Sequence, residues 1–287
     1  MSGWKTIVAA ETLAVALQRP DLVVVDCRHR LNDPGYGQNQ WLSCHIPGAV
    51  FAHLDRHLAG RLQPGRGRHP LPEIMQLCAT LGQFGISPAH QVVAYDERDG
   101  SMVAARLWFL LKLLGHENVA VLDGGFARWT AQGMPVSTQP RRPRVQTYWG
   151  SYDYERILDS DQVQARLEDP EQAPGWLIDA RSHERFTGEV EMVDRVPGHV
   201  PGAINRPFTE NLKPDGCFRS PIELAAAFRE LVGGRDPSEL AVMCGSGVTA
   251  CHHLLAMERA GLPGAKLFAD SWSGWISDRS RPIATGE

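Results

Sequence analysis

A cysteine begins a glycine-containing turn at residues 244–250, which read CGSGVTA. The apolar run at 240–243 is typical of a short buried strand, and residues 249–259 follow a helical pattern. A strand that leads through such a turn into a helix gathers main-chain N–H groups and the positive end of the helix dipole around the first residue of the turn. Because these groups favour an anion, Cys244 is predicted to ionise readily and to act as a nucleophile.

A structural role is the alternative for Cys244, because free cysteines are usually small buried core residues. Gly245 and Gly247 favour the interpretation of Cys244 as a nucleophile. Glycine permits positive φ angles and a close approach of the backbone, and its use here comes at a cost in conformational entropy. The turn therefore predicts an activated thiol.

Composition narrows the class of protein. The chain has 287 residues, 43% hydrophobic and 22% charged, which is ordinary for a globular protein of two domains. A net charge of −4 makes nucleic acid and anionic membrane poor partners. Six cysteines without metal-ligand spacing argue against a metal site and a disulfide framework. No cofactor motif, signal peptide or membrane-spanning stretch is evident, so we expect a cytoplasmic protein without a bound cofactor.

Several motifs occur twice, about 150 residues apart. The segment LVVVDCR at 22–28 resembles WLIDAR at 176–181, and HIPGA at 45–49 resembles HVPGA at 199–203. This nearly constant separation indicates one module used twice.

Short apolar runs alternate with helical patterns in both copies. This alternation predicts an α/β protein, with a mainly parallel sheet and helices on both faces in each domain. We place the domains at 1–138 and 156–287, joined by a linker at 139–155 that is rich in Pro, Arg and aromatic residues. Ligands of such sheets bind beyond the carboxyl ends of the strands, where Cys244 is expected.

Features shared by both copies are expected to build the fold. The Asp-x-Arg motifs at 26–28 and 179–181 are therefore predicted to form structural ion pairs at the ends of strands. His45 and His199 of the H-x-P-G-A turns are expected to have satisfied imidazoles, with a catalytic role as the alternative.

Features present in one copy are expected to carry the chemistry. The first copy has Asp96 where the second has Cys244, and a carboxylate cannot carry a persulfide, so only the second domain should be catalytic. Four residues after the shared arginine, the second copy has Arg185, whereas the first copy has Asn32. Arg185 is therefore a candidate for binding an anionic substrate, although a solvated surface role is the alternative.

The D-x-R, H-x-P-G-A and CGSGVTA motifs, in a duplicated frame that covers nearly the whole chain, resemble the tandem-rhodanese sulfurtransferases. The active turn is similar to that of 3-mercaptopyruvate sulfurtransferases. Thiosulfate sulfurtransferases of the rhodanese type typically carry an Arg-Lys pair where this sequence has Gly245 and Ser246.

This resemblance implies two rhodanese-like domains, of which the second is catalytic. It implies that Cys244 takes a sulfane sulfur from a small-molecule donor as a persulfide and passes it to a thiol, a thioredoxin-like protein or cyanide. Arg185 matches the arginine that holds the donor's anionic end, and Arg195 is the nearest candidate for a second one. The residues of the turn expected to surround the donor are Gly245, Gly247, Val248 and Thr249.

The resemblance also implies a proton relay. Ser246 and His45 match members of a proposed Ser-His-Asp relay of the mercaptopyruvate enzymes, with Asp33 as the aspartate. Departing pyruvate enolate needs a proton whereas departing sulfite does not, so a serine linked to a histidine suits 3-mercaptopyruvate.

Three alternatives are weighed against this function. Thiosulfate as donor would benefit from cations at positions 245 and 246, which are absent. A cysteine phosphatase would need an arginine at position 250, where the chain has Ala250. A non-catalytic rhodanese-like binding or regulatory module is the third alternative, and the intact Cys244 counts against it.

Overall fold

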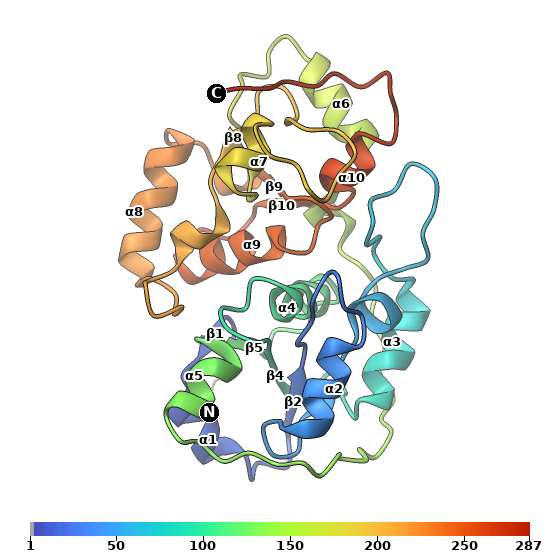
Figure 1. Cartoon of the computed structure of the whole chain (residues 1–287), viewed down its shortest axis with the longest axis vertical. Coiled ribbons are helices and arrows are strands. Elements are labelled where there is room, and N and C mark those ends of the chain that lie inside the picture. The colour runs from blue at the N-terminus through green and yellow to red at the C-terminus, as the bar shows by residue number, and fades with distance from the viewer. Residues whose placement is uncertain (1–2) are drawn as a thin grey trace. The chain divides into compact units, whose positions relative to one another are not determined.

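The computed structural model describes residues 3–287, which contain two five-stranded sheets (Figure 1). The strand orders are β1-β5-β4-β2-β3 and β6-β10-β9-β7-β8, and all neighbouring strands in these sheets are parallel. The second order repeats the first, strand for strand. The predicted α/β fold with two parallel sheets is confirmed.

The elements of the first copy are β1 (Ile7–Val8), α1 (Ala10–Ala16), β2 (Leu22–Asp26), α2 (Tyr36–Ser43), β3 (Val50–Phe51), the π-helical turn η1 (Leu54–Leu58), α3 (Ile74–Gln83), β4 (Gln91–Tyr95), α4 (Val103–Leu113), β5 (Val119–Leu122) and α5 (Gly125–Ala131). The elements of the second copy are β6 (Ile157–Leu158), α6 (Ser160–Glu168), β7 (Leu177–Asp179), α7 (His183–Thr187), β8 (Ile204–Asn205), α8 (Pro221–Val232), β9 (Ala241–Met243), α9 (Ala250–Arg259), β10 (Lys266–Phe268) and α10 (Ser271–Trp275). Single 3-10 turns are η2 (Tyr154–Arg156), η3 (Phe208–Asn211) and η4 (Pro237–Glu239).

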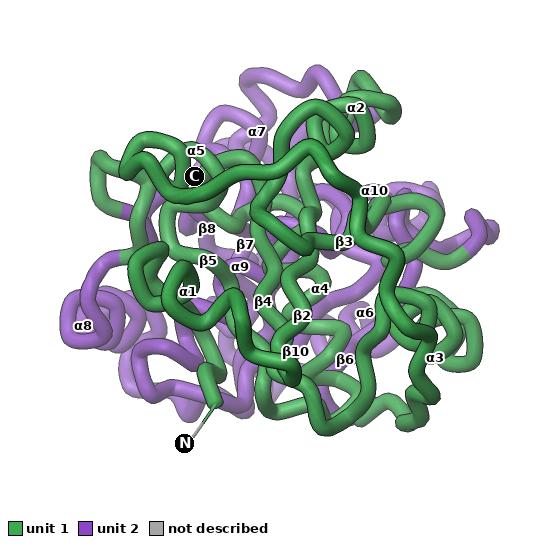
Figure 2. The backbone as a smooth tube through the Cα atoms, turned by 90° about the horizontal axis from the view of Figure 1, so that it is seen from below, with its two compact units in different colours: residues 1–60, 72–153, 213–218 green, residues 61–71, 154–212, 219–287 purple. Residues whose placement is uncertain are grey.

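The chain divides into two compact units that are not continuous in sequence (Figure 2). The first unit comprises residues 1–60, 72–153 and 213–218, and the second comprises residues 61–71, 154–212 and 219–287. The short segment 61–71, which precedes α3, therefore belongs to the unit that contains the Cys244 turn.

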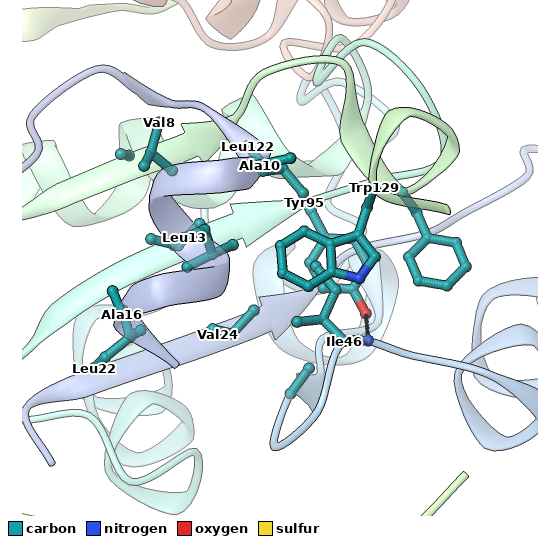
Figure 3. Close-up of a cluster of buried hydrophobic side chains, with 14 residues drawn as sticks. Val8, Ala10, Leu13, Ala16, Leu22, Val24, Ile46, Tyr95, Leu122 and Trp129 are labelled. Carbon is teal, nitrogen blue, oxygen red and sulfur yellow. Dashed lines mark hydrogen bonds between the residues drawn. The ribbon is translucent and has the colours of Figure 1, made fainter. Parts of the chain in front are cut away.

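The central strands β2, β4, β5, β7 and β9 are nearly continuous apolar runs and are buried at every position, so both faces of each sheet are covered. In the first unit, α1 and α5 cover one face, where Leu13 and Trp129 pack with Val24 and Tyr95 (Figure 3). Helix α4 packs against β4 and β5. In the second unit, α6 and α10 cover one face through Val163 and the indoles of α10, and α9 packs against β9 and β10.

The Asp-x-Arg motifs form the predicted ion pairs at the carboxyl ends of β2 and β7. Asp26 Oδ2 lies 2.7 Å from Arg28 Nη2, and Asp179 Oδ2 lies 2.6 Å from Arg181 Nη2. All four side chains are at most 1% exposed. Each arginine also donates to a main-chain carbonyl of the following loop, that of Cys44 or Gly198. A buried charge needs such partners, because its desolvation is costly.

We predict that Asp26→Asn lowers the free energy of unfolding by about 3 kcal/mol, because it leaves the buried Arg28 guanidinium without a counter-ion. The matched control is Asp21→Asn, which removes the carboxylate of the exposed Arg19–Asp21 pair and should cost less than about 1 kcal/mol. Urea denaturation of both variants measures the difference. Equal losses would contradict the structural role assigned to the buried pair.

Candidate active site around Cys244

The turn at residues 244–249 joins β9 to α9 and depends on a glycine that has no room for a side chain. Gly247 has a φ of +73°, and a Cβ there would stand 2.5 Å from the carbonyl oxygen of Ala269. The turn therefore lies directly against the chain that follows β10, and only glycine satisfies both its backbone angle and this contact.

Cys244 is buried at the carboxyl end of β9, with 3% of its surface exposed. Its main-chain N–H donates to Ser271 Oγ at 3.2 Å, and its carbonyl accepts from the N–H of Trp272 at 3.1 Å. The carbonyl of Gly245 accepts from the N–H of Ser273 at 3.0 Å. Three backbone groups of the turn are thus hydrogen-bonded to α10, which fixes Cys244 at the carboxyl end of β9.

The equivalent turn of the first unit shows what such a turn binds. Asp96 follows β4 there, and its carboxylate accepts from the main-chain N–H groups of Arg98, Gly100 and Met102 at 2.9 to 3.3 Å. These N–H groups lower the pKa of Asp96, whereas burial and the charge of Asp99 raise it, to about 7. A turn of the same kind in the second unit can likewise direct N–H donors at an anion on Cys244.

Ser246 is two residues beyond the cysteine and is bonded to a histidine from segment 61–71. Its Oγ lies 2.8 Å from His69 Nδ1, and each residue is 7% exposed. Segment 61–71 is attached to α10, since the N–H of Arg68 donates to Ser273 Oγ at 3.0 Å and Arg66 pairs with Asp270 at 3.2 Å. A hydroxyl and an imidazole in direct contact can pass a proton to a reacting atom nearby.

Two arginines lie beside the turn. A Cβ on Gly245 would stand 3.0 Å from Arg68 Nη2 and 3.6 Å from Arg185 Nη2, so the absence of a side chain at position 245 leaves space for both guanidinium groups. Arg185 comes from α7. Guanidinium groups present planar sets of N–H donors that match carboxylates, so this pair can bind the anionic end of a substrate.

Both arginines are paired with buried carboxylates. Arg185 makes hydrogen bonds of 3.0 to 3.2 Å to both oxygens of Glu191 and one of 3.0 Å to Asp194, which also bonds to Arg68. Burial alone would raise the pKa of Glu191, but N–H groups of Asp194 and Val193 and the charge of Arg185 outweigh burial and lower it. Burial raises the pKa of Asp194, although Arg68 and Arg185 act against it.

Three residues suggested by the resemblance make other contacts. In the first unit, the ring nitrogens of His45 lie 2.5 Å from the carbonyl oxygen of Trp41 and 3.2 Å from that of Gln139. The histidine bonded to Ser246 is therefore His69 and not His45. Asp33 is used in its own exposed turn, where it accepts from the N–H of Gly35 at 3.2 Å.

Arg195 is likewise not the second arginine beside the turn. Its guanidinium donates to the carbonyl of Ile276, and Arg68 takes the place next to Gly245. Val248 and Thr249 complete the turn as expected from the sequence, with Val248 buried and Thr249 immediately before α9.

Sequence analysis missed His69 and Arg68 because segment 61–71 carries none of the repeated motifs. The repeat could therefore not distinguish them from loop residues. The available signal was the stretch GRGRH at 65–69, which is basic, rich in glycine and unexplained by the fold pattern.

Comparison with known proteins identifies the repeat. Residues 9–132 and 159–278 match the family profile described as Rhodanese-like domain. The chain belongs to the rhodanese-like family. Its two rhodanese segments correspond to the two sheets and their helices.

Relatives that match nearly the whole chain are named after two different sulfur donors, 3-mercaptopyruvate and thiosulfate. The chain is 45% identical over 283 residues to the Pseudomonas aeruginosa protein "Probable 3-mercaptopyruvate sulfurtransferase", with 98% of both chains covered. It is 32% identical over 272 residues to the thiosulfate sulfurtransferase of Bos taurus, covering 93% of this chain and 89% of that protein. The solved structure of 3-mercaptopyruvate sulfurtransferase from Leishmania major matches with a TM-score of 0.81 and 31% identity, covering 94% of this chain and 73% of that one.

Within residues 3–287, no cluster of three or more His, Cys, Asp or Glu side chains could hold a metal ion. None of the helices in this part of the rhodanese chain is long and apolar enough to cross a membrane.

We predict that Gly247→Ala lowers the free energy of unfolding by about 3 kcal/mol, because the new Cβ must displace the chain at Ala269. Gly261→Ala is a matched control: Gly261 also has a φ of +73°, but no atom lies within 4 Å of its Cβ position. The control should lose only about 1 kcal/mol for the backbone angle. Denaturation curves and the alkylation rate of Cys244 test this, and equal behaviour of the two variants would contradict it.

Proposed function

We propose that the protein is a sulfurtransferase that moves a sulfane sulfur from 3-mercaptopyruvate, through a persulfide on Cys244, to a thiophilic acceptor. The choice of 3-mercaptopyruvate as donor rests on the hydrogen bond between His69 and Ser246, the residue two positions after the cysteine. Names among the relatives support sulfur transfer and include both donors. The acceptor is a thiol, a thioredoxin-like protein or cyanide, and a cytoplasmic location is part of the proposal.

In the first half-reaction, the Cys244 thiolate attacks the sulfur of 3-mercaptopyruvate. A sulfur–sulfur bond forms, the carbon–sulfur bond breaks, and its electron pair passes to pyruvate as the enolate. Arg185 and Arg68 bind the carboxylate of the donor. The hydroxyl of Ser246 delivers a proton to the enolate and is resupplied through His69, which yields pyruvate and the persulfide.

In the second half-reaction, the acceptor attacks the outer sulfur of the persulfide and regenerates the Cys244 thiolate. The turn stabilises this thiolate with its N–H groups, as the turn after β4 does for the Asp96 carboxylate. Atoms and charge therefore balance over the cycle without a cofactor.

Thiosulfate is the second candidate donor, and the name of the Bos taurus relative favours it. Two arginines beside the turn could hold its oxygens, but Gly245 and Ser246 add no charge of their own. Departing sulfite would also leave the Ser246–His69 pair without a role. A non-catalytic module is disfavoured by the intact Cys244 and by the buried proton-transfer pair next to it.

We predict that the protein gains one sulfur atom on Cys244 when it is mixed with 3-mercaptopyruvate alone. Peptide mass spectrometry locates the persulfide. Cys244→Ser should abolish both the mass gain and turnover, whereas Cys78→Ser, which alters a half-buried cysteine of the first unit, should preserve both. Full activity of Cys244→Ser would refute the proposed nucleophile.

We predict that Ser246→Ala slows turnover of 3-mercaptopyruvate by about a hundredfold, because the leaving enolate loses its proton donor. Turnover of thiosulfate should change little, since sulfite leaves without a proton. His69→Gln should have a similar effect, and the double variant should be no slower than either single variant because the two groups act as one unit. Steady-state assays with both donors decide this; equal losses with both donors would exclude a proton-transfer role.

A further inference from the structure

The carboxylates that pair with the two arginines determine the charge of the donor site. We propose, on the basis of the proposed function, that Asp194 is a specificity-determining residue: together with Glu191 it cancels the charge of Arg68 and Arg185, so that the site favours a monoanionic sulfur donor over a dianionic one. Asp194 would act through the arginines and has no role in bond breaking.

The contacts place Asp194 between the two arginines. Its Oδ2 accepts from Arg185 Nη2 at 3.0 Å, and its Oδ1 accepts from Arg68 Nη1. The Asp194 side chain is only 3% exposed, against 24% for Arg185 and 31% for Arg68. Because a guanidinium has only donors, both arginines need the acceptor that Asp194 provides.

The charges beside Cys244 cancel. Arg68 and Arg185 contribute two positive charges, and Asp194 and Glu191 contribute two negative ones. The neighbouring Arg181, which pairs with Asp179 and also lies 3.7 Å from Glu191, adds one positive charge, and Asp179 adds one negative charge. The site can therefore donate hydrogen bonds to an anion while carrying no excess positive charge.

The guanidinium groups nevertheless retain donors for a substrate. Arg185 bonds to the two carboxylates through Nε and Nη2, and its Nη1 takes part in none of these bonds. Arg185 Nη1 lies 3.7 Å, and Arg68 Nη2 3.0 Å, from the Cβ position of Gly245. A donor carboxylate next to the turn can thus bind without displacing Asp194.

Donor charge decides how strongly Asp194 acts. Coulomb energy is proportional to the product of the charges, so the Asp194 carboxylate repels thiosulfate, a dianion, about twice as strongly as the single carboxylate of 3-mercaptopyruvate. Neutralising Asp194 must therefore help thiosulfate more. Asp194 is the better residue to alter, because Glu191 also accepts the N–H groups of Val193 and Asp194 and so holds the loop.

The experiment compares Asp194→Asn, which preserves the shape of the side chain, with Glu189→Gln, which removes an exposed carboxylate from the same loop. We expect the ratio of kcat/KM for thiosulfate to kcat/KM for 3-mercaptopyruvate to rise about tenfold in Asp194→Asn and to stay constant in Glu189→Gln. Arg68→Gln should shift the ratio in the opposite direction, because it removes a positive charge. A ratio that does not change in Asp194→Asn would overturn the proposal.

A second measurement tests the charge without any sulfur transfer. Iodoacetate and iodoacetamide alkylate the same thiol and differ by one negative charge, so the ratio of their rates at Cys244, measured by peptide mass spectrometry, reports the local potential. This ratio should rise several-fold in Asp194→Asn and fall in Arg68→Gln. An unchanged alkylation ratio in an Asp194→Asn protein with the wild-type urea midpoint would overturn the charge assignment, even if sulfur transfer occurs. Absence of sulfur uptake by wild-type Cys244 from both donors would instead overturn the proposed function, and donor specificity with it.

Discussion

The guanidinium of Arg181 joins the parts of the second unit that surround Cys244. It is paired with Asp179 at the end of β7 and donates to the carbonyl of Gly198 at 2.8 Å, which fixes the loop after α7. It also lies over the indole ring of Trp272, 4.9 Å from the ring centroid. The main-chain N–H of Trp272 in turn donates a hydrogen bond to the carbonyl of Cys244. A buried charge requires fixed partners. The end of β7, the loop after α7 and helix α10 are therefore held in one arrangement around the thiol.

The first unit contains the same framework, with a different residue at the start of the turn. Arg28 pairs with Asp26, bonds to the carbonyl of Cys44 and lies 4.2 Å from the ring centroid of Phe126. The turn that follows β4 is filled by the carboxylate of Asp96. Both units thus contain the buried ion pair and its surroundings, while the residue that begins the turn is a carboxylate in the first unit and a thiol in the second.

The proposed sulfur transfer makes three demands on the second unit. In this scheme the turn stabilises an anion on sulfur, the Ser246–His69 pair delivers a proton, and Arg68 and Arg185 hold the donor. If the charges of the two arginines were not balanced, the site would also attract dianions that compete with the donor. In the proposed scheme, the buried carboxylates beside the arginines supply this balance.

The sequence by itself determined the parallel sheets, the Asp-x-Arg ion pairs and the turn at Cys244, because apolar runs, a repeated motif and a glycine-containing strand–turn–helix are local patterns. The family resemblance implied His45 as the partner of Ser246, whereas the imidazole bonded to Ser246 belongs to His69. Only the tertiary structure brought segment 61–71 to the turn and placed carboxylates against Arg185, since contacts between residues so distant in the chain depend on packing against α10 and leave no periodic signal in the sequence.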